Sequence, residues 1–436
     1  MLATKIDDLK QRLLASKLFK DSFWAVFGNG LGNGLLLLSG IIIARLLGKE
    51  LYGEYGVVKL TMFYVAMFAC FGLGTTSTKY IANFVETNKT HVRSIMRDAM
   101  KITLVFSFSL AFLIFLFAPQ LAVFLEEEHL SLALRFMAVI IVFKALNTTQ
   151  NGILAGLKEF KRLGINSILS GVFMLAICFP LTYKFELTGA LVSLSLSQCF
   201  NFLINAVSIK KIKGDYIDEK HNYTKELFHF SIPIALQEGL VNVTNWCAVM
   251  LLTKMSSSGE LGLYSASIQW NAIVTLLPTL LMNVILSYIS GANDNDNQAH
   301  NSIFKKMLYA NFISTIIPVA IFFILAGFIC SFYGDTFIEM PRVMRILLLV
   351  ALFGCCGTVF KAEYIANNKN WLYFSFRIIR DIVFLCSSYL LLKTYNGEDG
   401  AFYHSIATLF ATILFLILQV LGYLSIKKSK ERTIYS

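Results

Sequence analysis

Four basic side chains lie within long apolar stretches of this 436-residue sequence: Lys59, Arg135, Lys144 and Arg380. A cation at the centre of a bilayer costs about 2.5–3.5 kcal/mol on insertion scales, so such a residue is a candidate for binding an anion. Arg135 is close enough to the predicted outer end of its helix for its side chain to reach the interface. We therefore single out Lys59, Lys144 and Arg380 as predicted substrate-binding residues.

Amide side chains accompany these charges at helical spacing. Asn147 and Asn151 share a helical face with Lys144, and a polar stripe of this kind cannot face lipid without cost. We predict that the stripe binds substrate in a cavity; the alternative is a hydrogen-bond network between helices within one half of the protein. Asn242, on one helical face with Glu238, is a further predicted substrate ligand. Weaker polar faces are formed by Asn29 with Asn33, and by Gln198, Asn201 and Asn205.

Two carboxylates are candidates for coupling transport to a proton or sodium gradient. Glu238 lies deep in an apolar stretch, where its alternative role is to brace a discontinuous helix start after Pro233. Asp381 follows Arg380 directly and lies four residues after Arg377. An i,i+4 pair with Arg377 would neutralise Asp381 and leave Arg380 free, whereas a purely structural cluster would involve all three.

The sequence lacks the patterns of common enzymes. It contains no GxxxxGK[ST], HExxH or GxSxG motif. Its 8 cysteines lie almost all in apolar runs without CxxC spacing, which is typical of buried packing groups. We expect no catalytic residue, no metal and no resident cofactor. The glycine run at 28–34 indicates close helix packing or a bend, with a gating hinge as the alternative.

The composition explains why charged and amide side chains within the apolar stretches are exceptional. Hydrophobic residues make up 56% of the chain and charged residues 15%, against about 25% charged in soluble domains. The net charge of +11 does not indicate nucleic-acid binding, because the basic residues fall in short clusters between apolar runs. We predict an all-α membrane protein with twelve spans, at 22–44, 56–78, 102–118, 130–153, 164–183, 188–209, 230–253, 263–289, 307–329, 343–364, 372–392 and 400–424.

The spans form two predicted halves. Residues 52–55 (YGEY) and 261–264 (LGLY) follow the first and seventh spans at the same offset, which indicates a duplication. Six spans per half make the repeat parallel, with a cavity between the halves. Most of the 38 Lys and Arg residues fall on one side, which predicts cytoplasmic termini. The predicted segments are a basic amphipathic helix at 1–21, an N-lobe at 22–209, a cytoplasmic linker at 210–229, a C-lobe at 230–424 and a basic cytoplasmic tail at 425–436.

Three short stretches resemble a known family. They are LLGKELYGEYG at 46–56, FGLG at 71–74 and LAGLKEF at 154–160. With the twelve spans, they resemble the polysaccharide and O-antigen flippases of the multidrug/oligosaccharidyl-lipid/polysaccharide (MOP) exporter superfamily.

The resemblance implies a V-shaped transporter of the bacterial inner membrane that serves surface polysaccharide or lipopolysaccharide biosynthesis. It would flip a polyprenyl-diphosphate-linked oligosaccharide to the outer leaflet by alternating access, with a polysaccharide polymerase as a partner. The alternatives are a multidrug/cation antiporter of the same superfamily and a peptidoglycan lipid-precursor flippase. The antiporter is expected to carry a deep carboxylate in its first lobe, which this chain lacks, and the precursor flippase usually has fourteen spans.

Overall fold

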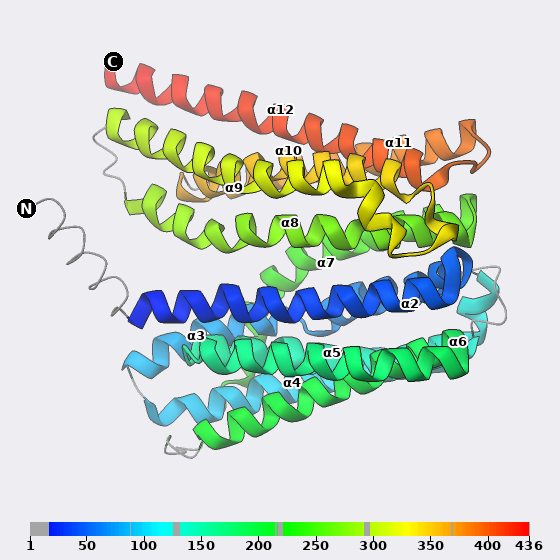
Figure 1. Cartoon of the computed structure of the whole chain (residues 1–436). Coiled ribbons are helices and arrows are strands. Elements are labelled where there is room, and N and C mark those ends of the chain that lie inside the picture. The colour runs from blue at the N-terminus through cyan, green and yellow to red at the C-terminus, as the bar shows by residue number, and fades with distance from the viewer. Residues whose placement is uncertain are drawn as a thin grey trace, which may run out of the picture. The chain divides into compact units, whose positions relative to one another are not determined.

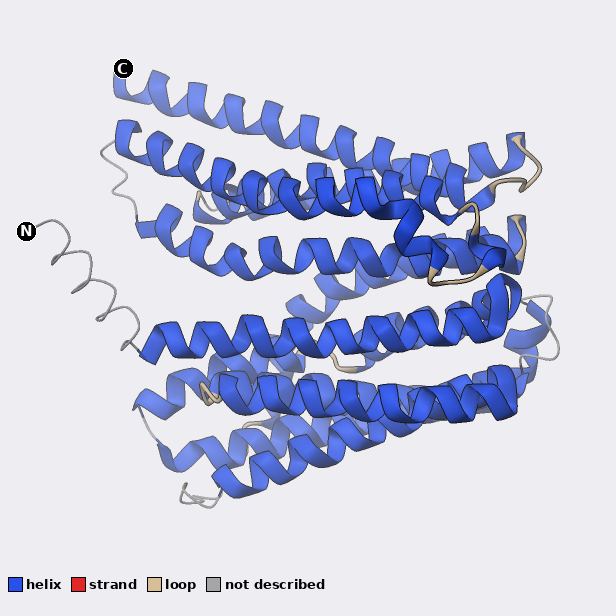
Figure 2. Cartoon of the chain, viewed as in Figure 1, coloured by secondary structure: helices blue, strands red, loops and turns tan. Residues whose placement is uncertain are grey.

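A computed structural model describes residues 17–87, 89–124, 131–213, 216, 221–291, 297–367 and 369–435. The described residues are almost entirely helical and include no strand (Figure 2). Most of the predicted amphipathic segment 1–21 lies outside them. The helices, labelled in Figure 1, are α2 (Lys17–Ala69), α3 (Leu73–Thr87), α4 (Val92–Phe124), α5 (Ser131–Gly156), α6 (Phe160–Lys213), α7 (Thr224–Met255), α8 (Ser258–Gly291), α9 (Asn297–Ser331), α10 (Met340–Ala366), α11 (Asn370–Thr394) and α12 (Gly400–Tyr435), with 3-10 turns at Lys89–His91 and Asp335–Phe337.

The two longest helices, α2 and α6, are each broken at one residue. The break in α2 is at Gly48 (φ 71°, ψ 173°) and that in α6 is at Glu186 (φ 47°, ψ −127°). Helix α6 therefore contains the fifth and sixth predicted spans, and α2 contains the first span and most of the second. The break at Glu186 falls where the sequence predicted the fifth and sixth spans to separate.

The second predicted span, 56–78, is wrong as a single helix. Helix α2 ends at Ala69, and the chain turns through Phe71 (φ 53°) and Gly72 (φ 68°) before α3 begins. A Cβ at Gly72 would lie 2.9 Å from Ile234 Cγ2, so both the left-handed backbone and the packing favour glycine. The discontinuous start expected for α7 is also wrong, because this helix runs without a break through Pro233.

The chain divides into two compact units. Unit 1 contains the chain up to Leu47 and Tyr55–Trp246, and unit 2 contains Gly48–Glu54 and Cys247 onward. Their boundary falls within α7. In unit 1, α5 packs against α3, α4 and α6, and in unit 2, α10 packs against α8, α9 and α12. The fourth and tenth spans, which the sequence repeat pairs, thus lie at the centre of their units.

The segment Gly48–Glu54 packs entirely within unit 2. The Lys49 backbone N donates to Thr336 Oγ1 (3.2 Å), and Gln269 Nε2 donates to Tyr52 Oη (2.6 Å). A Cβ at Gly53 would collide with the Ser258 carbonyl oxygen, and one at Gly262 would collide with the Lys49 carbonyl oxygen. Gly53 and Gly262 are equivalent positions of the sequence repeat, so the duplicated stretches meet through backbones that only glycine allows to approach so closely.

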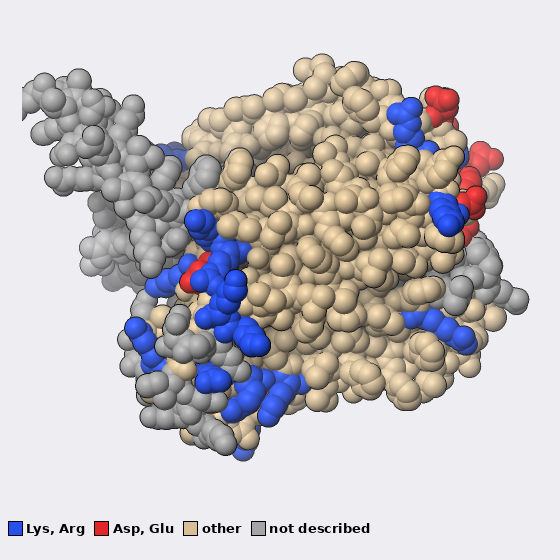
Figure 3. Space-filling view, turned by 60° about the horizontal axis from the view of Figure 1, so that its bottom comes forward, with Lys and Arg blue, Asp and Glu red and all other residues tan. Residues whose placement is uncertain are grey.

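The helices are suited to a membrane. Among the described residues, 7 helices are long and apolar enough to cross a bilayer, and two of them, α2 and α6, each carry two predicted spans. Helix α11 carries Arg377, Arg380 and Asp381 in its first half, which lowers its hydropathy. Figure 3 shows one face with a broad area free of Lys, Arg, Asp and Glu, and charged residues toward its two ends. The chain is a multi-pass, all-α membrane protein, as the sequence predicted.

Candidate functional site

A cavity with basic residues in its wall lies within unit 2. It has a volume of about 360 Å³ and is lined by α8, α10, α11 and α12. Three basic side chains line it: Lys361 from α10, and Arg377 and Arg380 from α11. Of these three residues, only Arg380 was predicted from the sequence to bind substrate. A wall with three cations is suited to an anionic ligand.

The two arginines are held by one buried carboxylate. Arg377 Nε donates to Asp381 Oδ1 (3.1 Å) and Oδ2 (3.3 Å), and Arg380 Nη1 donates to Asp381 Oδ1. Asp381 is 4% exposed. The prediction that the pair with Arg377 leaves Arg380 free is therefore wrong, and all three residues form one cluster. The cluster keeps a net charge of +1, because two guanidiniums share one carboxylate.

The lining also includes neutral polar groups. Asn271 Nδ2 donates to the Leu347 carbonyl oxygen (2.6 Å), which fixes this side chain in α8. Gln419 of α12 is buried, and its Oε1 has no hydrogen-bond partner among the described residues. A buried acceptor without a partner is costly, so Gln419 is ready to accept a hydrogen bond from a ligand. Neither Asn271 nor Gln419 was predicted from the sequence, where each appears only as a single amide side chain in an apolar stretch.

Each of the two predicted lysines of unit 1 lies over an aromatic ring. Lys144 Nζ lies 5.6 Å from the Phe63 ring centroid, and Lys59, one turn before Phe63, lies 5.6 Å from the Tyr55 ring. Within the described chain, neither ammonium forms an ion pair with a carboxylate. Both side chains are half-buried. Arg135, by contrast, is exposed and lies over Phe115.

The predicted amides have different surroundings. Asn147 is 2% exposed and its Nδ2 donates to the Gln198 carbonyl oxygen (3.0 Å) and Oε1 (3.2 Å). It joins α5 to α6, as in the alternative of a hydrogen-bond network between helices. Asn151 is exposed and lines a second cavity, described below. Asn242 Nδ2 donates to the Glu238 carbonyl oxygen (2.8 Å) within α7 and is half-buried.

The two coupling candidates also differ. Glu238 is half-buried and its Oε1 accepts a hydrogen bond from Thr75 Oγ1 of α3 (3.5 Å). Asp381 is bound by two guanidiniums, whose charges oppose the approach of a further cation. Glu238 is therefore the better placed of the two. No group of three or more His, Cys, Asp or Glu that could hold a metal ion occurs in the part of the chain that the structure describes.

Comparison with solved structures identifies the class of fold. An inward-facing multidrug resistance MATE family transporter of the MOP superfamily aligns with a TM-score of 0.76 at 13% identity, covering 92% of this chain and 96% of that chain. A MOP superfamily transporter from Pyrococcus furiosus, described as having a binding pocket of reverse polarity that suggests a different function, aligns with a TM-score of 0.69 at 15% identity, covering 95% and 98%. The chain has the MOP exporter fold.

Within this class, the chain belongs to the polysaccharide biosynthesis protein family, which it matches over residues 18–292. A Shigella flexneri protein named as an O-antigen transporter is 20% identical over 407 residues, covering 91% of this chain and 96% of its own length. The EPS I polysaccharide export inner membrane protein EpsE of Ralstonia solanacearum is 19% identical over 395 residues, covering 89% and 90%. The family resemblance seen in residues 46–56, 71–74 and 154–160 is confirmed.

Proposed function

We propose that this protein is a flippase that moves an oligosaccharide repeat unit of a surface polysaccharide, such as an O-antigen, across the bacterial inner membrane. The repeat unit would be joined to a polyprenyl diphosphate and pass from the inner to the outer leaflet by alternating access. The observation that carries the proposal is the cavity with Lys361, Arg377 and Arg380, in a chain of the polysaccharide biosynthesis family. The relatives named for O-antigen transport and polysaccharide export support it.

The chemistry of this substrate fits the cavity. A diphosphate headgroup is anionic and loses hydration when it leaves the membrane surface, so it needs fixed cations and hydrogen-bond donors. Arg380 and Arg377 are oriented by Asp381, and a guanidinium can bind a phosphate through two parallel hydrogen bonds. Lys59 and Lys144 would add positive charge for the diphosphate or for acidic sugars, while the polyprenyl chain stays in lipid.

The remaining parts of the proposal concern energy, orientation and partners. We assign coupling to a proton or sodium gradient to Glu238 before Asp381, because Asp381 is occupied by two arginines. The excess of basic residues in loops of one side supports cytoplasmic termini. A polysaccharide polymerase would receive the flipped unit. A multidrug antiporter for cationic compounds is disfavoured, because the net positive charge of the unit 2 cavity repels such substrates.

Gene deletion tests the proposal. The deletion strain should lose surface glycan and accumulate a lipid-linked oligosaccharide in the inner leaflet, and the wild-type gene should reverse both effects. Drug susceptibility, measured on the same strain, should stay unchanged. Accumulation of the peptidoglycan lipid precursor would point to the precursor flippase instead. Normal surface glycan together with drug hypersensitivity would contradict the proposal and favour the antiporter.

A further inference from the structure

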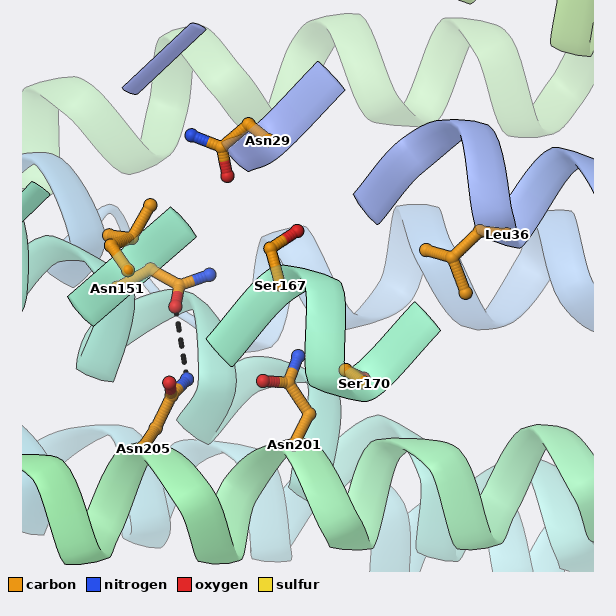
Figure 4. Close-up of a pocket in the computed structure, with 8 residues that line it drawn as sticks. Asn29, Leu36, Asn151, Ser167, Ser170, Asn201 and Asn205 are labelled. Carbon is orange, nitrogen blue, oxygen red and sulfur yellow. Dashed lines mark hydrogen bonds between the residues drawn. The ribbon is translucent and has the colours of Figure 1, made fainter. Parts of the chain in front are cut away.

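Unit 1 contains a smaller polar cavity that an anionic headgroup does not explain. Its volume is about 60 Å³, and its lining comes from α2, α5 and α6 (Figure 4). No charged side chain is among the described residues that line it. The lining residues are Asn29, Asn151, Ser167, Ser170, Asn201 and Asn205, together with Leu36 and Leu163. The cavity therefore favours an uncharged ligand that forms hydrogen bonds.

Part of this lining is fixed by the protein itself. Asn205 Nδ2 donates to Asn151 Oδ1 (3.0 Å), as Figure 4 shows, and Asn166 Nδ2 donates to Asn205 Oδ1 (2.8 Å). Asn205 is fully buried and Asn166 is 5% exposed. These bonds hold α5 and the two segments of α6 in register and orient the amide of Asn151 at the cavity wall.

Other lining groups are left for a ligand. Within the described chain, the amide of Asn201 and the hydroxyls of Ser167 and Ser170 have no hydrogen-bond partner. Polar groups in a cavity wall that lack protein partners need water or a ligand to satisfy them.

The apolar residues and the size narrow the choice of ligand. Leu36 and Leu163 give the cavity a patch that suits a methyl group but not a hydroxyl. A volume of about 60 Å³ holds roughly four water-sized groups, which is the number of heavy atoms in an acetamido group. That group has one hydrogen-bond donor, one acceptor and one methyl. Leu36 is 38% exposed and Asn151 is also exposed, so the cavity has an opening.

We infer that the unit 1 cavity binds the acetamido substituent of an N-acetylated amino sugar in the transported glycan. The inference rests on the proposed function, because it assumes that the substrate carries a sugar. Asn151, Asn201 and the two serines would hydrogen-bond the amide, and Leu36 and Leu163 would contact its methyl.

Weak sugar binding can be measured by saturation-transfer difference NMR on the full-length protein in lipid nanodiscs. The probes are N-acetylglucosamine, glucose and glucosamine, which differ only at one ring position. We expect saturation of the N-acetyl methyl protons and binding about tenfold tighter than that of glucose, from two hydrogen bonds and a buried methyl. Equal binding of the three sugars, or none, as from a cavity that holds only water, would overturn the inference.

Two substitutions and one control locate the binding. Asn201→Leu and Ser170→Ala should each weaken N-acetylglucosamine binding by roughly fivefold, the effect of one hydrogen bond. Ser195→Ala on the same helix is the control, because the Ser195 hydroxyl bonds the Leu191 carbonyl oxygen within α6 and lies outside the cavity lining. Unchanged binding in both Asn201→Leu and Ser170→Ala proteins that unfold at the wild-type temperature would contradict the assignment.

The gene-deletion strain separates this inference from the proposed function. If a lipid-linked oligosaccharide accumulates but N-acetylglucosamine does not bind, the acetamido site is wrong and the flippase proposal stands. If no lipid-linked oligosaccharide accumulates, the flippase proposal fails whatever the sugar binding. Binding of inorganic diphosphate to the Asn201→Leu protein should match that of the wild type, because no charged side chain lines the cavity that contains Asn201 among the described residues.

Discussion

The cavities of the two units are built from different side chains. In unit 2, three cations line a cavity of about 360 Å³ and one buried carboxylate orients two of them. In unit 1, neutral amides and hydroxyls line a cavity of about 60 Å³, and two of the amides, Asn151 and Asn205, are linked by a hydrogen bond. The cavity of unit 2 therefore suits an anion, whereas the cavity of unit 1 suits an uncharged group that forms hydrogen bonds.

The largest effect should come from Asp381→Ala. This substitution leaves the half-buried guanidiniums of Arg377 and Arg380 without their shared partner, which costs about 3 kcal/mol of unfolding free energy. Thermal unfolding of the purified protein measures the loss. Glu398→Ala, at an exposed residue of the same unit, is the control and should change stability little. A small effect of Asp381→Ala would mean that the arginines do not need the carboxylate.

Arg380→Gln should mainly affect binding. A charged hydrogen bond contributes about 1.5–3 kcal/mol, so binding of inorganic diphosphate should weaken by roughly tenfold or more. Isothermal calorimetry on the purified protein checks this, and surface glycan in the complemented deletion strain should fall in parallel. Arg135→Gln is the matched control, because Arg135 is exposed and distant in sequence from the cavity lining. Equal effects of the two substitutions would show that net charge, rather than the cavity, governs binding.

Asn205→Leu tests the neutral network of unit 1. The substitution removes the hydrogen bond from Asn166 Nδ2 to Asn205 Oδ1 and the one from Asn205 Nδ2 to Asn151 Oδ1. Their loss costs about 1–3 kcal/mol of unfolding free energy. The unfolding temperature should fall while diphosphate affinity, measured on the protein that remains folded, stays unchanged. A loss of diphosphate binding by the folded protein would remove the distinction between the two cavities.

Lys59→Gln and Lys144→Gln should have the smallest effects singly. Each ammonium is half-buried and lies over an aromatic ring, so each contributes long-range attraction more than a fixed contact. We expect at most about a fivefold loss of diphosphate affinity, or roughly 1 kcal/mol, and a weaker dependence on salt. Titrations at two salt concentrations measure both. Normal surface glycan in all of the Lys59, Lys144 and Arg380 alanine variants would reject the assignment of these cations to transport.

Much of the fold could be predicted because its signals are local. Hydropathy located the helices, and Lys184 to Glu186 marked the break of α6. The break between α2 and α3 was missed, because the need for glycine at position 72 comes from Ile234, far along the chain. The assignment of Gly48–Glu54 to unit 2 was missed for the same reason.

The site could be predicted only in part. Burial and charge pointed to Arg380, but not to Lys361 or Arg377, which share its cavity. Asn147 and Asn151 lie on one helical face, yet one is buried against α6 and the other lines the cavity of unit 1. Periodicity predicts that such residues share a face. It does not reveal whether the neighbouring helix or a cavity lies opposite each of them.

The packing of Gly48–Glu54 within unit 2 also constrains the order of events during synthesis. This segment leaves the ribosome early, but its partners Gln269, Thr336 and Phe337 are made much later. Tyr52 is 1% exposed in the folded protein, but it cannot pack until α8 and the turn at Asp335–Phe337 have been translated. Unit 2 cannot be completed from the second half of the gene alone.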